Sequence, residues 1–472
     1  MSEQVHLSMF EEVYPPELLQ ACAQQSPTRQ QKRRRLRQFT ALSVLWFLLA
    51  MVLWSRLSQG RVWDKLTHWL QDRWPEAPQE PAGASALSYQ RAILGVEPLK
   101  QLFEQGTHVL CTPETPGAWY RGHRLMALDG SLFNVPDTPV NDQAFGRSRN
   151  QYGKGAYPQA RVVMLTECGS HAPLALQIGG YAEAELHGAY AILPKLMRGM
   201  LLLHDANFFG GAYLEALNAK GVLALFALPS TVAVQRQRNL PDGSYLAVLK
   251  PHAKAVYPMK QAVWLRIIEY QITDERLGKP GHVYRLATTW LNPRTAPAKE
   301  LLVLYHERWE IEIVVDEIKT HLRVQQKVLR SHTPEGVHQE LYALFLVQYA
   351  IRALMSHSAF EADLDPDRLS FTEAVFQISE AVADDRGEAP AVQQLRMQRL
   401  LQRLRRNPLP ARRLRINRRE LKQVYHKYKP KKRDVPPPKP FGPEERFEDF
   451  VVVLVRPQGS KQLAEARALV PI

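Results

Sequence analysis

Residues 301–322 read LLVLYHERWEIEIVVDEIKTHL, a stretch without Gly or Pro whose residues fall into separate faces at about 100° per residue, which predicts one helix. One face carries four polar residues spaced by three, four and seven positions: Tyr305, Arg308, Glu312 and Lys319. An apolar stripe adjoins that face, so the helix can lie on a core with the polar residues turned into a cleft. One acid, two cations and a phenol on one line suit a phosphodiester, although ordinary solvated helices carry similar charge spacings.

Two aspartates upstream of this helix close apolar runs that predict strands. Asp129 follows RLMAL and precedes SLFNV, and Asp205 follows MLLLH. With a helical segment at roughly 185–198 between them, this order predicts an α/β fold. Carboxylates at strand ends, converging with Glu312 on a helix, are what two-metal phosphoryl transfer requires, because hard divalent ions prefer carboxylate oxygens. The plain alternatives are a two-residue hairpin at Asp129 and Gly130 and a helix cap at Asp205.

A strand-rich segment from about 226 to 292 separates Asp205 from Glu312. A compact nuclease core needs no connection of that length, so the segment predicts an inserted β subdomain. Tyr284, in its last predicted strand, could stack on an unpaired base or pack on the sheet. Beyond the motif helix, Thr333 and Pro334 predict the start of a long core helix. Further predicted elements are a helix at 369–383 and a short strand at 450–455.

Residues 1–115 are predicted to be helical, with a Pro- and Gly-rich connector near 74–85. Residues 38–55 are uncharged and follow the basic run QQKRRRLR. This pattern is shared by membrane anchors, but the run is marginal in length and contains Thr40 and Ser43. We therefore expect a buried helix of an N-terminal domain, and a membrane anchor is the alternative.

Charge is concentrated in one part of the 472-residue chain. The net charge is +14, and residues 401–433 contain fourteen Lys or Arg against one acid, Glu420. A basic block of that size favours a polyanion as partner, above all nucleic acid, although solvated basic tails exist. The three cysteines form no CxxC pair, which argues for a reducing cytosol and against a thiolate zinc site.

The spacing Tyr, two residues, Arg, three residues, Glu, six residues, Lys matches the YREK signature of DDE transposases in the insertion-sequence-four family. The chain resembles that family over roughly residues 115–385, including DGS at Asp129 and HDANFF at Asp205. The resemblance implies a ribonuclease H-like α/β core. The domains then expected are a helical, DNA-binding domain at 1–115, a core in two parts at 116–225 and 295–385, an inserted β subdomain at 226–294 and a basic C-terminal region at 386–472.

The same resemblance assigns roles to the site residues. It implies that Asp129, Asp205 and Glu312 are catalytic and bind two Mg²⁺ ions, with Mn²⁺ able to substitute. Their expected substrate is double-stranded DNA, cut at terminal inverted repeats through a hairpin intermediate and then joined to target DNA. The expected DNA-binding residues are Tyr305 and Arg308 on a displaced nucleotide, Lys319 on a phosphate near the cut, and Tyr284 as a base-stacking aromatic.

Family membership further implies a dimer in the synaptic complex, no membrane association, and a cytoplasmic location in bacteria, on the nucleoid when DNA is bound. The alternative function is a catalytically inactive, transposase-derived DNA-binding protein. The presence of all three acids disfavours that alternative.

Overall fold

The computed structural model describes residues 8–26, 39–73, 83–150, 153–229, 231–251, 257–279, 281–306, 310–323, 327–383, 389–410 and 439–454. The chain forms two compact units. Unit 1 comprises residues 1–200 and 308–409, and unit 2 comprises residues 201–307 and 410–472. The predicted domain boundaries at 225/226 and 294/295 differ from this division.

The N-terminal part of unit 1 is helical, as the sequence predicts. Its helices are α1 (Ser8–Glu11), α2 (Pro16–Gln24), α4 (Ala41–Leu53), α5 (Gln59–Arg73), α6 (Ala84–Leu94) and α7 (Glu97–Gly106). Every side chain of α4 from Ser43 onward is buried, and Thr40 caps the helix by accepting a hydrogen bond from the Ser43 amide at 3.0 Å. The prediction of a buried helix within 38–55 is therefore confirmed. In the described part of the chain, no helix has both the length and the apolar character needed to span a bilayer.

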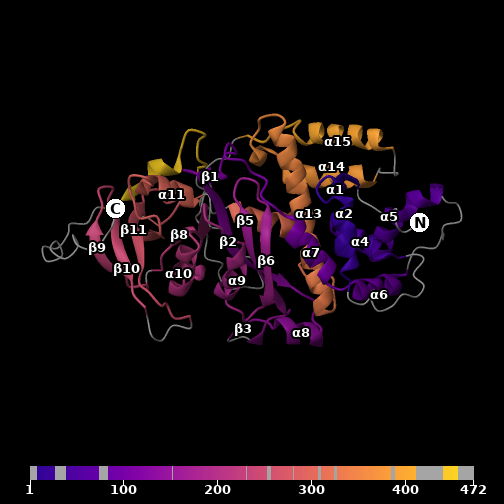
Figure 1. Cartoon of the computed structure of the whole chain (residues 1–472), viewed down its shortest axis with the longest axis horizontal. Helices are drawn as coiled ribbons and strands as arrows, with labels where there is room; N and C mark the ends of the chain where they lie inside the picture. The colour runs from indigo at the N-terminus through magenta and orange to yellow at the C-terminus, as the bar shows by residue number, and fades with distance from the viewer. Residues whose placement is uncertain are drawn as a thin grey trace. The chain divides into compact units, whose positions relative to one another are not determined.

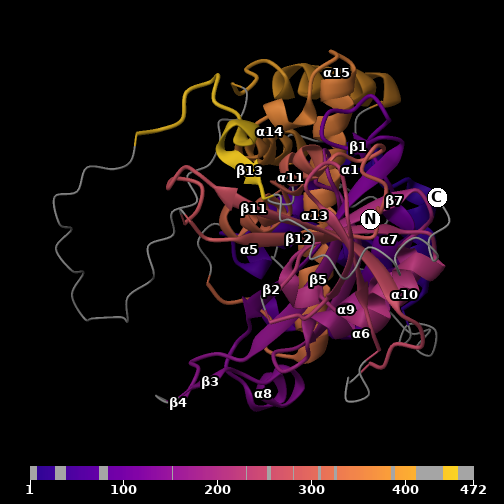
Figure 2. The same cartoon turned by 90° about the vertical axis from the view of Figure 1, so that its left-hand side faces the viewer.

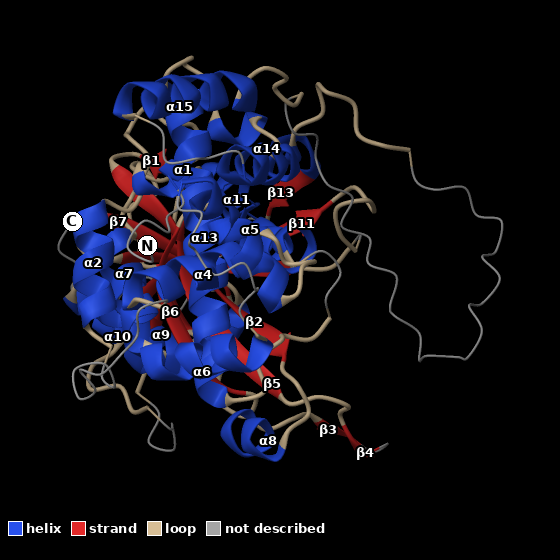
Figure 3. Cartoon of the chain, turned by 90° about the vertical axis from the view of Figure 1, so that its right-hand side faces the viewer, coloured by secondary structure: helices blue, strands red, loops and turns tan. Residues whose placement is uncertain are grey.

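The helix α13 (Pro334–Phe360) is the centre of the helical part of unit 1. Thr333 caps it by accepting a hydrogen bond from the Gly336 amide at 3.2 Å, as predicted from Thr333 and Pro334. Figure 3 shows α4 and α7 gathered beside α13, and both pack against it. Two further helices, α14 (Phe371–Ala383) and α15 (Pro390–Leu404), also pack against α13 and lie around its upper end in Figure 1.

The sheet of unit 1 is antiparallel, with the strand order β6-β5-β2. Its strands are β1 (Trp119–Tyr120), paired with the start of β2, β2 (His123–Asn134), β5 (Gln159–Glu167) and β6 (Pro173–Gly180). The helix α9 (Glu185–Ile192) packs on β5 and β6, so closely that a Cβ on Gly188 would lie 2.5 Å from the Val163 side chain. A small hairpin of β3 (Arg149–Asn150) and β4 (Gly153–Lys154) projects near α8 (Pro139–Phe145), as Figure 2 shows.

The prediction that Asp129 ends a strand is wrong. Asp129 lies in the middle of β2 and pairs with Met164 of β5, and the ladder continues through Gly130 without a turn. Gly130 lies against the Glu185 side chain, since a Cβ there would lie 2.6 Å from the Glu185 carboxylate. A glycine inside a strand often marks such a close approach. Here the glycine follows an aspartate, and the resulting Asp-Gly sequence is also typical of a hairpin turn.

Unit 2 is built on a mixed sheet with the order β7-β8-β12-β11-β10-β9. The strands are β7 (Met200–His204), β8 (Leu223–Ala227), β9 (Gln235–Asn239), β10 (Tyr245–Leu249), β11 (Val263–Ile272) and β12 (Tyr284–Thr288). The pair β7 and β8 is parallel and is connected through α10 (Gly211–Ala219), whereas the other pairs are antiparallel. The strand-rich segment therefore extends the sheet that begins with β7. The short strand predicted near the C-terminus is β13 (Val451–Val453), on β11.

The stretch 301–322 is not one uniform α-helix. The helix α11 (Ala298–His306) belongs to unit 2, and α12 (Glu310–Asp316) belongs to unit 1, while residues 307–309 lie outside the described residues. From Glu317 to Leu322 the backbone is a π-helix, labelled η5, so the prediction of a regular α-helix is wrong there. The predicted basic region at 386–472 is described only at 389–410 and 439–454.

Candidate active site

Unit 1 brings the helix with Glu312 onto the strand with Asp129. The helix α12 packs against β2, and both carboxylate side chains are half-buried. The Asp129 carboxylate accepts a hydrogen bond from the Gly130 amide at 2.8 Å, which fixes its position beside the strand. Partial burial keeps both acids accessible while the packed elements hold them in place.

Lys319 joins this group through the π-helix. Its ammonium donates to the Ser131 hydroxyl at 2.7 Å and to the Leu132 carbonyl at 2.8 Å, two and three residues beyond Asp129 on β2. The same nitrogen lies 4.8 Å from the centre of the Phe133 ring. Burial and, to a smaller extent, the nearby Arg323 lower the pKa of Lys319 to about 8, whereas the charge of Asp129 opposes the shift. Lys319 is therefore a half-buried cation beside Asp129, which the spacing alone did not reveal.

Asp205 directly follows β7, as predicted. Its carboxylate accepts hydrogen bonds from the Asn207 amide at 2.9 Å and from the Asn207 side chain at 3.3 Å, so it caps the short 3₁₀ turn that follows. The capping alternative is thus present in the structure. It does not exclude a second role, because a carboxylate has about four acceptor sites and Asp205 remains half-exposed.

The Tyr305 hydroxyl bridges two strands of unit 2. It donates to the carbonyl of His204 at 3.2 Å and accepts from the amide of Ala227 at 3.2 Å. His204 is the last residue of β7 and immediately precedes Asp205. Tyr305 therefore fixes the strand end from which Asp205 projects, a contact that its spacing from Glu312 did not indicate.

Tyr284 lies on β12 beside a tyrosine that the sequence did not single out. The rings of Tyr284 and Tyr270 stack with their centres 5.4 Å apart, and the Tyr284 hydroxyl accepts a hydrogen bond from the Lys279 amide at 3.1 Å. Burial raises the pKa of Tyr270 above its ordinary value, and Tyr305 and Tyr284 add to the shift. Cross-strand register could have identified Tyr270, since it pairs directly with Tyr284.

The remaining predicted site residue, Arg308, lies outside the described residues. The three acids belong to both units, with Asp129 and Glu312 in unit 1 and Asp205 in unit 2. Within the described ranges, no group of three or more His, Cys, Asp or Glu side chains is close enough to hold a metal ion. The joint use of these acids in one metal site stays a prediction.

The chemistry of the site residues suits a phosphodiester and a hard cation. The three half-exposed carboxylates are the oxygen donors that Mg²⁺ and Mn²⁺ prefer. Lys319 adds a positive charge beside Asp129, where a DNA phosphate would need compensation.

Two family models match the chain in succession. The model described as insertion element 4 transposase N-terminal matches residues 4–104, and the model described as transposase DDE domain matches residues 120–349.

Two curated relatives come from Escherichia coli (strain K12). Transposase InsG for insertion sequence element IS4 is 29% identical over 382 residues, which cover 79% of this chain and 83% of the relative. Putative transposase InsZ is 27% identical over 230 residues, covering 47% of this chain and 71% of the relative. Among solved structures, a piggyBac transposase synaptic complex with hairpin DNA is similar with a TM-score of 0.43 and 13% identity over 84% of each chain. That similarity is too low to support any inference about this chain.

The matched regions cover the helical N-terminal part, the strands with Asp129 and Asp205, and the helix with Glu312. The α/β fold is confirmed, and its core is the ribonuclease H-like core of a DDE domain, which implies dependence on a divalent metal ion. The chain belongs to the DDE transposases of the insertion-sequence-four family, enzymes that cleave DNA and transfer its strands in transposition.

Proposed function

We propose that this chain excises an insertion element at its terminal inverted repeats and joins the freed ends to target DNA. Besides the family match, one observation carries the proposal. The helix with Glu312 packs against the strand with Asp129, and Lys319 of the same helical stretch bonds to that strand. An acid pair with a cation at its side is the arrangement that a scissile phosphate requires.

Asp129, Asp205 and Glu312 hold the metal in this proposal. Two Mg²⁺ ions, replaceable by Mn²⁺, supply activation of the attacking oxygen and stabilisation of the leaving oxygen when they are bound. Asp205 contributes from a strand end held by the Tyr305 hydroxyl. Glu312 and Asp129 contribute from packed elements of unit 1.

Lys319 binds a phosphate near the cut. An ammonium group has three N–H donors, and two of them are used on Ser131 and Leu132. The third donor and the charge act on the phosphate, while the two contacts to β2 hold the ammonium at a fixed distance from Asp129.

Tyr305 and Arg308 hold the displaced end nucleotide if cleavage proceeds through a DNA hairpin, and Tyr284 stacks on its base. Flipping a nucleotide out of the stack requires a few kcal/mol and a receptor. The Tyr270 ring backs Tyr284 on the neighbouring strand, which makes a firm aromatic platform. The cutting complex contains two chains on two ends and acts in the cytoplasm of a bacterial cell, and the bacterial origin of the two curated relatives supports only the kind of cell.

The test uses the full chain and a duplex that carries the inverted repeat bordering the gene. We expect Mg²⁺-dependent cleavage at the end of the repeat and at least about a hundredfold slower cleavage by Glu312→Gln, because metal-held charge stabilisation is worth several kcal/mol. Glu361→Gln, on an exposed side chain of unit 1, is the control and retains the wild-type rate. Cleavage by Glu312→Gln at the wild-type rate would show that Glu312 is not part of the active site. Binding of the wild-type chain without cleavage would favour the inactive DNA-binding alternative.

A further inference from the structure

A buried network of hydrogen bonds and an ion pair connects the π-helix that carries Lys319 to the helix α13. Glu317 begins this helix and is 2% exposed, and Arg352 of α13 is 3% exposed. The two form a bidentate ion pair, in which Arg352 donates through Nη2 to one carboxylate oxygen and through Nε to the other at 3.2 Å. Gln348, one turn earlier on α13, donates to the same carboxylate at 2.8 Å.

The network also reaches the turn between β5 and β6. Gln348 donates to the carbonyl of His171, whose ring lies 3.8 Å from the Glu317 carboxylate and 3.3 Å from Asp367. His171 has a φ of 60°, an uncommon left-handed conformation for a residue other than glycine. Such a conformation persists only where the surroundings hold it.

Burial by itself would raise the pKa of Glu317, but the charge of Arg352 and the contact with His171 outweigh it and hold the pKa at about 2. The charged or titratable groups beside Glu317 are therefore Arg352 and His171, and the His171 ring in turn contacts Asp367. Residues buried this deeply do not contact DNA, so the network acts through the backbone that it holds.

That backbone has an unusual geometry. The Arg323 amide donates to the Ile318 carbonyl, five residues back, at 3.2 Å. π-Helical turns are rare, arise mostly within α-helices, and frequently occur at functional sites. The wider turn changes the direction in which Lys319 projects relative to Glu312, and in this direction the ammonium reaches Ser131 and Leu132.

We infer that Glu317 is a positioning residue, which, through Arg352 and Gln348, holds the π-helix in the geometry that sets Lys319 and Glu312 on β2. This inference rests on the proposed roles of Glu312 and Lys319. A displacement of about 1 Å at a reacting group can slow catalysis by about a hundredfold, so loss of the network reduces the rate without removing a catalytic group.

The test replaces the buried pair by apolar residues of similar size, Glu317→Leu with Arg352→Met. Such replacement of a buried ion pair is often neutral for stability, whereas removal of one partner leaves a buried charge. The matched control is Glu361→Leu with Arg405→Met, which removes the half-exposed ion pair of 2.6 Å elsewhere in unit 1. Four quantities are measured: the free energy of unfolding, affinity for the inverted-repeat duplex in EDTA, single-turnover cleavage rate with Mg²⁺, and amide hydrogen exchange of residues 312–322.

We expect the buried-pair variant to fold and to bind the duplex within about threefold of wild type, but to cleave at least about tenfold more slowly. Amide exchange in 312–322 is expected to increase by a similar factor, and the control pair changes none of these quantities. A folded variant that cleaves within threefold of wild type, while Glu312→Gln is inactive, would overturn the positioning role. Cleavage by Glu312→Gln itself would instead overturn the proposed active site.

If the buried-pair variant does not fold, the variant Gln348→Met tests the positioning role instead. It removes the hydrogen bonds to the Glu317 carboxylate and to the His171 carbonyl and keeps the size of the side chain. We expect this variant to fold and to cleave at least about threefold more slowly, with faster exchange in 312–322. An unchanged rate and unchanged exchange would overturn the inference.

Discussion

Lys319 shows how much one side chain depends on its surroundings. In an exposed position it would keep its charge far above neutral pH, but burial between the π-helix and β2 lowers its pKa to about 8. Below that pH the side chain is an ammonium that can bind a phosphate, and as the pH rises through about 8 the DNA-free protein loses this charge. Between about pH 8 and 10.5 the unfolded chain then binds more protons than the folded chain, so the free energy of unfolding rises with pH across that window.

This titration predicts a pH-dependent effect of Lys319→Gln. At pH 6.5 we expect kcat/KM for cleavage to fall by about 10- to 100-fold, since a hydrogen bond from a charged donor is worth about 1.5–3 kcal/mol. The ratio of wild type to variant should shrink above pH 8, because kcat/KM reports the pKa values of the free enzyme. Lys100→Gln, at an exposed lysine of α7, is the control and is expected to leave the profile unchanged. A ratio that stays constant from pH 6.5 to 9.5 would contradict the assigned role.

The other site residues differ in how far they could be predicted. Asp205 after β7 could be predicted, because an acid after a short apolar run follows directly from the strand pattern. The mid-strand position of Asp129 could not, because Asp-Gly favours a hairpin and the contact of Gly130 with Glu185 depends on the tertiary fold. The Tyr305 hydroxyl bonds to His204, 101 residues away in the chain, and to Ala227, 78 residues away, and no local sequence pattern contains such contacts.

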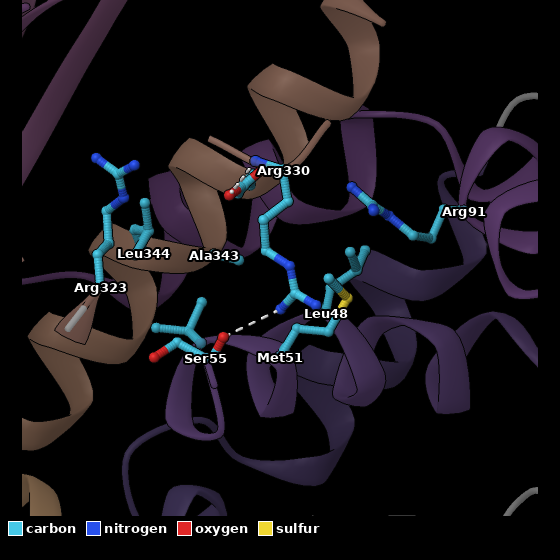
Figure 4. Close-up of a pocket in the computed structure, with 10 residues that line it drawn as sticks. Leu48, Met51, Ser55, Arg91, Arg323, Arg330, Ala343 and Leu344 are labelled. Atoms are coloured by element: carbon cyan, nitrogen blue, oxygen red, sulfur yellow. Dashed lines mark hydrogen bonds between the residues drawn. The ribbon is translucent and has the colours of Figure 1, made fainter. Parts of the chain in front are cut away.

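At the scale of elements, the helices α4 and α13 and most strands follow from apolar runs and caps. The π-helix does not, because its sequence has the spacing of a regular α-helix and its geometry is imposed by Arg352 and Gln348. The helices α4 and α13 are also linked by the segment that precedes α13. Arg330 reaches across a pocket to the chain that follows α4, where it donates to the carbonyl of Ser55 at 3.4 Å (Figure 4) and to that of Leu57 at 2.8 Å.

This link predicts the effect of Arg330→Met. The substitution keeps the length of the side chain and leaves the Ser55 and Leu57 carbonyls without their charged donor. We expect the free energy of unfolding to fall by about 1–3 kcal/mol in urea titration. Arg399→Met, on the exposed face of α15, is the control and is expected to change it by less than about 0.5 kcal/mol. Equal stability of the two variants would show that Arg330 does not stabilise this junction.

At the scale of the whole molecule, the YREK spacing could predict the family, which the two family matches confirm, whereas the domain boundaries drawn from composition stay a prediction. The division into two units could not be predicted, because the boundary between them falls within the YREK motif, between Tyr305 and Glu312. Such a division depends on which strands and helices are in contact in the folded chain, and these contacts cannot be read from the sequence. The strong positive charge at 401–433 lies largely outside the described residues, so its role in binding DNA stays a prediction.

The central claim is that Asp129, Asp205 and Glu312 serve one metal-dependent site. The most direct measurement is titration of Mn²⁺ into the full chain bound to the inverted-repeat duplex, with bound ion counted by electron paramagnetic resonance. The duplex is supplied already cut at the end of the repeat and carries a dideoxynucleotide at that 3′ end, so that no further reaction occurs during the titration. We expect Asp129→Asn, Asp205→Asn and Glu312→Gln each to weaken Mn²⁺ binding by at least about tenfold, whereas Asp64→Asn, on an exposed side chain of α5, leaves it unchanged. Wild-type Mn²⁺ binding by any one of the three acid variants would contradict the account.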